Sequence, residues 1–270
     1  MTAFVHHFGF DFRTGIRNRS LLLLNYLFPL AFFLMIGFVM PGLNPWFLDA
    51  MIPAMIIFAI YCAAILGLPD PLVQARDSGI FRSYKINGVP RLNILAIPAL
   101  TTSLHLVIVT VVICIAAPLL FNAPAPVNWL NFAIVFLATL FACAGLGVLI
   151  GVISPNSRAT ILLSQLLFLP SMLIGGLMLP YSILPRAAQM AARLLPSTHA
   201  MNAFKGLAMG QTADFSPWGG VIVLLSGGVL AFALAYALFR WDSQHTTRRV
   251  PAVAGFLVLL PYALSILLMK

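Results

Sequence analysis

The sequence predicts an all-α membrane protein in which a bundle of helices crosses a bilayer. Of its 270 residues, 61% are apolar and 8% charged, against about 45–50% and about 25% in a soluble domain. Several apolar runs reach the roughly 20 residues that a helix needs to cross a hydrocarbon core of about 30 Å. These runs lack the alternation of polar and apolar residues that is typical of membrane β-barrels. The composition therefore excludes a soluble globular protein.

Six apolar runs are long enough to span a bilayer. They cover residues 20–41, 47–69, 94–121, 127–153, 159–179 and 218–239. A further apolar stretch over residues 250–269 contains Pro251 and Pro261, so it either crosses as a seventh span or lies kinked in the membrane interface. No linker or strong internal repeat divides the chain, and we expect one transmembrane domain over residues 1–270.

Basic residues between the runs predict the orientation. The N-terminal segment and the segments after the second, fourth and sixth runs carry eleven of the 15 Lys and Arg, and the alternate segments carry four. By the positive-inside rule the N-terminus is cytoplasmic. The same rule accounts for the net charge of +9, so no nucleic-acid partner is expected. The three cysteines lie in apolar runs without metal-ligand spacing and are read as buried thiols.

The N-terminal segment, residues 1–19, has the pattern of an amphipathic interfacial helix. Asp11, Arg13 and Arg17 are expected to point away from its apolar face. That face, with Phe4 beside it, consists of Val5, Phe8, Phe12 and Ile16. Two interpretations stay open: a lipid anchor, or a lever that ties the first span to a cytoplasmic partner.

The cytoplasmic segment 70–91 is predicted to hold one helix of about four turns. It begins at Asp70 and Pro71, a cap followed by proline at the first helical position, and it ends at Asn87 and Gly88. Its charged and apolar side chains are Arg76, Asp77, Arg82, Lys85, Ile80, Phe81, Tyr84 and Ile86. The mixture suits docking onto a partner protein, and the alternative is a helix that lies on anionic headgroups.

The outer segment 180–217 predicts two short amphipathic helices that dip into or lie on the outer leaflet. Pro185 can open the first helix and Pro196 can end it, after which Ser197 can cap the second helix as far as Gly210. Gly175 and Gly176, near the end of the fifth run, permit a bend or close packing.

Ionisable residues inside the runs are informative because burying them in lipid is costly. His105 is the one such residue, and a hydrogen-bonded contact between helices is favoured over a proton relay. Gly147 and Gly151 form a small-xxx-small pair typical of helix packing. No phosphate-binding loop or catalytic motif occurs, and His199 with Asp214 is a chance-level pair for an embedded enzyme. Any energy for active transport must therefore come from another subunit.

Two stretches carry a resemblance to a known family. Residues 145–210 hold a glycine-rich helix end, a short basic turn, a Gly-Gly pair and proline-bounded outer helices, and residues 75–92 read ARDSGIFRSYKINGVPRL. Both are similar to the permease subunit of type 2 ATP-binding-cassette exporters, and the likeness covers nearly all of residues 1–240. Asp77 stands where that family usually has Glu, and the stretch 250–269 exceeds its usual six spans.

The resemblance implies a permease domain with three functional segments. The ATPase-coupling helix would use Arg76, Asp77, Gly79, Phe81, Arg82, Tyr84 and Lys85. The connecting helix would use Phe8, Phe12, Arg13 and Arg17. The outer gate would use Gly175, Gly176, Pro180, Pro185, Pro196 and Lys205. The resemblance also implies a second permease subunit, identical or paralogous, and a separate cytoplasmic ATPase that binds ATP and Mg.

The leading hypothesis is thus a non-enzymatic subunit of an exporter in the bacterial inner membrane, with an amphiphilic, drug-like or lipid-linked cargo. The chain itself is expected to hold no cofactor and no metal. The alternative is a channel or ion-coupled secondary transporter that works alone and needs His105.

Overall fold

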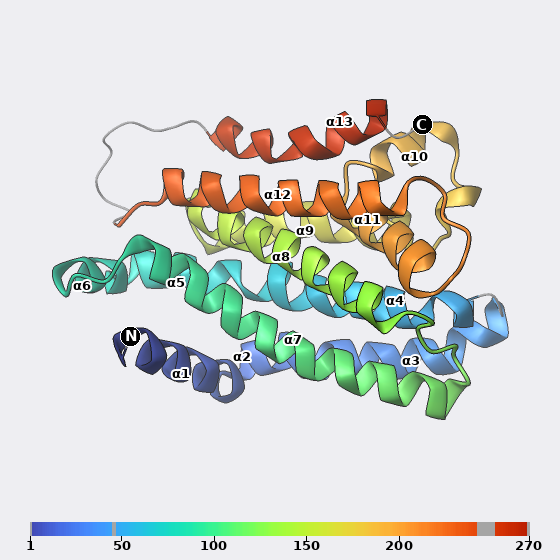
Figure 1. The fold of residues 1–270 in the computed structure, drawn as a ribbon. Helices are drawn as coiled ribbons and strands as arrows, with labels where there is room; N and C mark the ends of the chain where they lie inside the picture. The colour runs from blue at the N-terminus through green and yellow to red at the C-terminus, as the bar shows by residue number, and fades with distance from the viewer. Residues whose placement is uncertain (1, 45–46, 242–251, 269–270) are drawn as a thin grey trace.

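The structure, a computed structural model, describes residues 2–44, 47–241 and 252–268, and the side chains of residues 8–44, 47–241 and 254–268. Every regular element in these ranges is helical, and they contain no strand. The helices form an elongated bundle in which most long helices run roughly along one axis (Figure 1). The predicted all-α membrane bundle is confirmed.

Six helical segments are long and apolar enough to cross a membrane. The first span consists of α2 (Arg19–Leu22), the π-helical turn η1 (Leu23–Leu27) and α3 (Phe28–Leu43). The second consists of α4 (Phe47–Ile60), η2 (Tyr61–Gly67) and α5 (Pro69–Asp77). The other four are α7 (Arg91–Phe121), α8 (Trp129–Ile153), α9 (Ser157–Ile174) and α12 (Pro217–Leu238). Each corresponds to one predicted apolar run.

The second span forms the centre of the bundle. In its most apolar stretch 94% of the residues are buried, against 28% in the first and fifth spans. Helix α8 packs closely against it, because a Cβ at Gly147 would overlap the carbonyl oxygen of Ala64 and one at Gly151 would lie 2.9 Å from that of Pro69. The glycine pair thus serves helix packing, as predicted.

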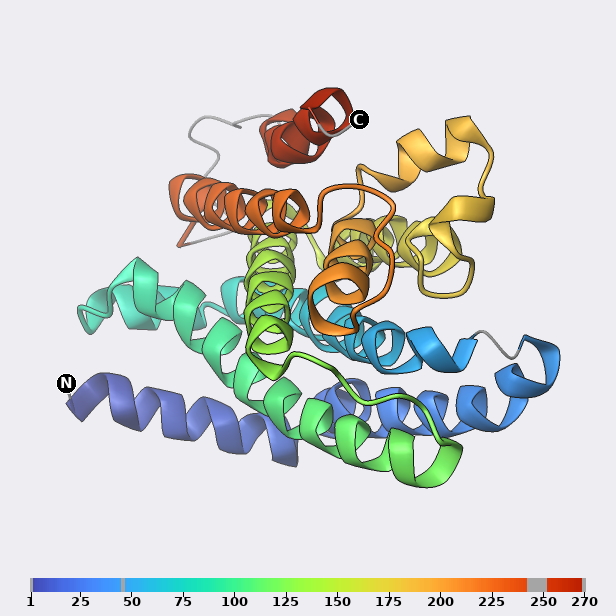
Figure 2. The same ribbon diagram turned by 45° about the vertical axis from the view of Figure 1, so that its right-hand side comes forward.

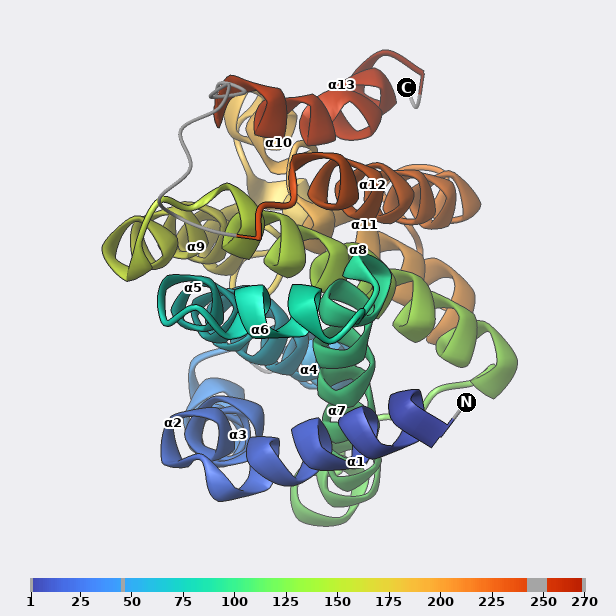
Figure 3. The ribbon, with the colours of Figure 1, turned by 90° about the vertical axis from the view of Figure 1, so that its left-hand side faces the viewer.

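The short helices gather at two opposite ends of the bundle. Helix α1 (Thr2–Arg17) and helix α6 (Ile80–Ile86) share one end, called here the first end (Figures 1 and 3). At the opposite, second end lie η3 (Tyr181–Ile183), α10 (Arg186–Ala192), α11 (Pro196–Ala203) and η4 (Phe204–Ala208) (Figure 1). The elements predicted as cytoplasmic and those predicted as outer are therefore separated by the length of the spans.

The C-terminal stretch forms η5 (Ala252–Leu259) and α13 (Leu260–Leu268), which lie alongside α12 (Figures 1 and 2). Its apolar helix, Ala254–Leu268, is shorter than the six spans. The contact with α12 is close, since Tyr262 is completely buried and its hydroxyl occupies the space that a Cβ at Gly227 would need. Residues 250–251 and 269 of the predicted seventh stretch lie outside the described residues.

Candidate functional site

Helix α1 packs against the part of α7 nearest the first end. The ring of Phe12 stacks on His105 with 4.4 Å between ring centroids, and Asp11 accepts a hydrogen bond from the hydroxyl of Thr101. Gly15 permits this approach, because a Cβ there would lie 2.5 Å from Nε2 of His105. The helix is thus attached to the bundle by specific contacts.

The packed face of α1 differs from the predicted one at two positions. Asp11 points toward α7 because a hydroxyl there supplies a donor that offsets its burial, whereas Ile16 is 45% exposed. Phe4 and Val5 are among the side chains outside the described residues. Half-buried aromatic and exposed basic residues make up the rest of the predicted connecting-helix set: Phe8, Phe12, Arg13 and Arg17.

His105 joins two spans. Its Nδ1 lies 2.6 Å from the hydroxyl of Tyr26, which places a hydrogen bond between α7 and η1. The predicted contact between helices is therefore confirmed.

The predicted single helix over segment 70–91 is wrong, since the structure has two helices with a break between them. The second span continues through Asp70 and Pro71 into α5, because the chain before Pro69 is already helical and the prolines fall in the first turn of α5. Ser78 ends α5, and Gly79 adopts φ +79° before α6 begins. A positive φ favours glycine, so the residue type at position 79 suits the break between α5 and α6.

Arg76 attaches α5, the first helix of this pair, to the end of α8. The residue is 7% exposed. Its Nη2 donates to the carbonyl oxygen of Ser154 at 2.8 Å and of Pro155 at 3.3 Å, and its Nη1 donates to that of Val152 at 3.4 Å. These carbonyls lie at the C-terminal end of α8, where helix carbonyls lack partners and carry partial negative charge. No sequence signal indicates this contact, because its acceptors belong to the backbone.

Helix α6 contacts two further elements. Phe81 is buried, and its ring lies 5.3 Å from that of Phe239, just after α12. Burial, and then the charge of Asp11 on α1, raise the pKa of Tyr84 above its ordinary value. The solvent-exposed face, called here the tip, consists of Ile80, Arg82, Ser83, Lys85 and Ile86. Asp77, which is 40% exposed in its side chain, lies just before the break.

At the second end, α9 stops at Ile174, and a turn at Gly175 and Gly176 with φ +89° at the second glycine follows it. Helix α10 begins directly after Pro185, as predicted. Helix α11 begins at Pro196 without a side-chain cap, so Ser197 does not cap it. The backbone N–H of Ser197 donates instead to the hydroxyl of Tyr61 at 3.0 Å.

Helix α11 does not lie on the surface of the bundle. All eight of its residues are buried, and it is packed against α8 and α12. Its small and medium side chains, together with Gly220 of α12, allow close approach: a Cβ at Gly220 would lie 3.0 Å from the carbonyl oxygen of His199. Helix α11 is therefore covered by protein, and the depth of the two outer helices in the outer leaflet stays a prediction.

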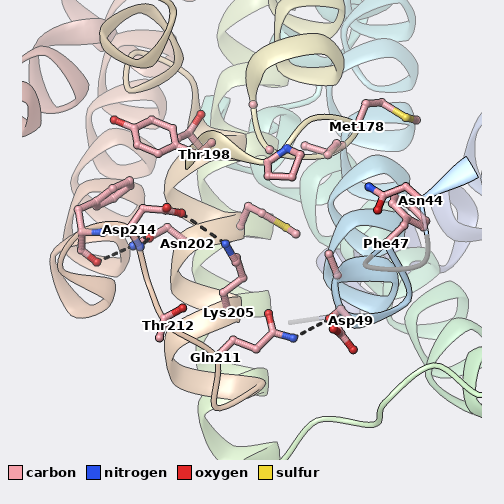
Figure 4. Close-up of a pocket in the computed structure, with 18 residues that line it drawn as sticks. Asn44, Phe47, Asp49, Met178, Thr198, Asn202, Lys205, Gln211, Thr212 and Asp214 are labelled. Carbon is pink, nitrogen blue, oxygen red and sulfur yellow. Dashed lines mark hydrogen bonds and ion pairs between the residues drawn. The ribbon is translucent and has the colours of Figure 1, made fainter. Parts of the chain in front are cut away.

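A pocket of about 280 Å³ opens between α11, η4, the start of α4 and the turn after α9. Figure 4 shows Lys205 extending toward Asp214 on one side and Gln211 reaching Asp49 on the other. We call it the Lys205 pocket; its lining includes four of the six predicted outer-gate residues, namely Gly175, Gly176, Pro180 and Lys205. Pro185 and Pro196 do not line it.

Several polar residues of the Lys205 pocket were not singled out from the sequence. Asn202 donates to the carbonyl oxygen of Phe215 at 2.8 Å and accepts from the backbone N–H of Asp214 at 2.7 Å. Gln211 donates to the carbonyl oxygen of Asp49 at 2.8 Å. These residues come from segments about 160 positions apart, so the sequence contains no local pattern that unites them.

His199 and Asp214 do not form the pair considered for an enzyme. Nε2 of His199 lies 2.8 Å from the carbonyl oxygen of Arg193 and 3.3 Å from Oγ of Ser265, while Asp214 pairs with Lys205 at 3.4 Å. Burial lowers the pKa of His199 to about 4; the bond to the Arg193 carbonyl opposes this shift, and the charge of Arg193 adds to it. His199 therefore stays neutral at physiological pH.

Comparison with known proteins identifies the class to which this fold and these segments belong. The family described as ABC-2 type transporter matches residues 4–209, so the chain belongs to that family of membrane transport permeases. It is a multi-pass transport subunit, and family membership implies an ATPase partner.

Among individual proteins, the chain is 23% identical over 230 residues to a Bacillus subtilis (strain 168) protein named "Putative transport permease YvfS". The match covers 83% of this chain and 92% of the relative. No solved protein structure matches the chain.

Proposed function

We propose that this permease forms half of the translocation pathway of an ATP-driven exporter and couples through α5 and α6 to a separate ATPase subunit. The observation that carries the proposal is that the tip of α6 is exposed while Arg76 holds the neighbouring α5 against the end of α8. Side chains of Arg82 and Lys85 supply positive charge there, and Ile86, 81% exposed, supplies apolar surface. Such a mixture suits a protein interface.

The contacts of the pair support transmission of movement. A displacement of the helical pair would act on the end of α8 through Arg76 of α5 and on the residue just after α12 through Phe81 of α6. It would also act on α1 through the electrostatic interaction between Tyr84 and Asp11. Closure of the ATPase around ATP and Mg would thereby reach two further spans, α8 and α12, and the connecting helix. Gly79, with its positive φ, sets the angle between the two helices.

Further parts of the proposal concern partner, cargo and location. Most residues in the apolar stretches of the first and fifth spans are not buried within the chain. Their surface is therefore open to contact with lipid and with a second permease subunit, identical or paralogous.

An apolar bundle with a polar pocket at the second end suits an amphiphilic, drug-like or lipid-linked cargo that leaves there. The distribution of basic residues supports a bacterial inner membrane protein with a cytoplasmic N-terminus.

The test is co-purification of the tagged permease from its native membrane, with Ile86→Glu compared against Ile183→Glu. Both isoleucines are exposed, 81% and 65% respectively, at opposite ends. The wild type and Ile183→Glu should retain a stoichiometric ATPase, and Ile86→Glu should release it. A wild-type preparation without an ATPase would instead support a channel or ion-coupled transporter that works alone.

A further inference from the structure

The Lys205 pocket has a chemistry that the coupling of ATP hydrolysis to transport does not require. Its walls come from three parts of the chain: the start of α4, the turn after α9, and the stretch from α11 to Phe215 (Figure 4). Its volume of about 280 Å³ is close to the lower end of the roughly 300–1,000 Å³ typical of small-molecule sites. A small ligand therefore fits it.

The polar side chains that line the pocket include two carboxylates, those of Asp49 and Asp214, which only accept hydrogen bonds. The amide of Asn202 is already used by the backbone, and the N–H of Gln211 is used by Asp49. Among the described residues the carboxylate of Asp49 has no hydrogen bond or ion pair, and the ion pair of Asp214 uses only Oδ2. A ligand that brings donors is thus complementary to the groups that remain.

The charge of the pocket favours a cation. Two carboxylates, those of Asp49 and Asp214, face one ammonium group, that of Lys205. The side chains of Lys205 and Asp214 are 21% and 18% exposed and lie 3.4 Å apart, so this pair largely neutralises itself. The C-terminal end of α9 reaches the pocket at Gly175 and adds partial negative charge, which the partial positive charge at the N-terminal end of α4 offsets. The charges of the lining side chains therefore sum to one negative charge, which lies at the solvent-exposed carboxylate of Asp49.

The remaining walls are apolar and polarisable. Phe47 and Phe215 are buried aromatic residues, and Met178 and Met201 also line the pocket. The guanidinium of Arg193 already lies 4.8 Å from the centroid of the Phe215 ring, so Phe47 is the aromatic ring that remains for a cation. The thioethers adapt to irregular apolar groups. The pocket therefore offers an apolar surface next to an anionic one.

We propose that the Lys205 pocket binds a small organic ammonium ion, with its protonated nitrogen at Asp49 and its apolar group against Phe47 and Met178. The inference goes beyond the proposed function and stands without it, because binding here requires neither an ATPase nor a direction of transport.

The test is isothermal titration of the purified permease, with whatever subunits remain bound, against three molecules that share one carbon skeleton. Protonated phenethylamine should bind, whereas neutral phenethyl alcohol and anionic phenylacetate should bind at least about tenfold more weakly, a difference that corresponds to about 1.4 kcal/mol. Added salt should weaken amine binding because the pocket is open to solvent. Equal binding of the amine and the alcohol would overturn the proposal.

Three variants separate the site from a loss of folding. Asp49→Asn should weaken amine binding about two- to fivefold, because the carboxylate of Asp49 is exposed to solvent. Asp70→Asn, which removes a carboxylate of α5 that does not line the pocket, should leave amine binding unchanged. Lys205→Gln should strengthen amine binding, because it removes the competing cation and frees Asp214. If Asp70→Asn binds the amine as the wild type does and Lys205→Gln binds it more weakly, the assignment is contradicted.

Discussion

The guanidinium of Arg76 donates hydrogen bonds to three backbone carbonyls at the end of α8 and in the turn after it. A buried hydrogen bond that involves a charged group contributes about 1.5–3 kcal/mol. We therefore expect Arg76→Gln to lower the thermal unfolding temperature of the purified protein and to weaken coupling to the ATPase. Arg76→Lys should recover part of the loss, since one ammonium group cannot reproduce the fork of donors.

The exposed Lys85 of α6 is the control for this prediction. Lys85→Gln removes the same charge from the neighbouring helix and should change stability by no more than about 0.5 kcal/mol. If Arg76→Gln and Lys85→Gln unfold at the same temperature, the buried contact contributes nothing to stability.

His199 predicts a dependence of stability on pH. Its pKa in the folded protein is about 4, below the ordinary value of 6.5, so between these two values the unfolded chain binds more protons than the folded one. Stability should therefore fall as the pH decreases from 6.5 to 4, by up to about 3 kcal/mol. Thermal unfolding across this window measures it, and His199→Gln should flatten the part of the slope that His199 causes.

Among the elements, the pair α5 and α6 depends on the left-handed backbone at Gly79. Proline requires φ near −65°, and it would also remove the bond from the N–H of Gly79 to the carbonyl of Arg76. We expect Gly79→Pro to abolish ATPase-coupled transport while the protein still inserts into the membrane. Transport assays in inverted vesicles, together with quantification of inserted protein, measure both.

Gly88→Ala is the matched variant, because Gly88 also has a positive φ of +71° and, like Gly79, has open space where a Cβ would be placed. It introduces backbone strain of about 1–2 kcal/mol at the far end of α6 and should leave most of the transport intact. Normal transport by Gly79→Pro would contradict the proposal that Gly79 sets the angle between α5 and α6.

The long elements could be predicted from the sequence, whereas the contacts of the short ones could not. Runs of apolar residues gave all six spans because length and hydropathy alone decide whether a helix suits a bilayer. Helix-start signals failed at Pro71 and Ser197, since helix continuation from η2 and burial of α11 overrode local preferences. The partners of Arg76 and the walls of the Lys205 pocket depend on tertiary packing, which no local pattern encodes.

For the whole molecule, the separation of the two ends predicts opposite labelling by a membrane-impermeant thiol reagent. In a background without Cys62, Cys114 and Cys143, a cysteine at Lys85 should react only after the membrane is permeabilised, and one at Arg186 should react in intact cells. Both positions are exposed. Labelling of the two from the same side would contradict the arrangement, and labelling with reversed sides would place the N-terminus outside.

The contact between Arg76 and the turn after α8 also affects how this protein can evolve. Every amino acid contributes a carbonyl, so side chains at positions 152, 154 and 155 can change without loss of an acceptor. The contact therefore constrains the side chain at position 76, whereas at positions 152, 154 and 155 it constrains only the backbone. A saturation mutagenesis scan should show a sharp intolerance at position 76 beside broad tolerance in the turn that it holds, provided that the turn keeps its backbone shape.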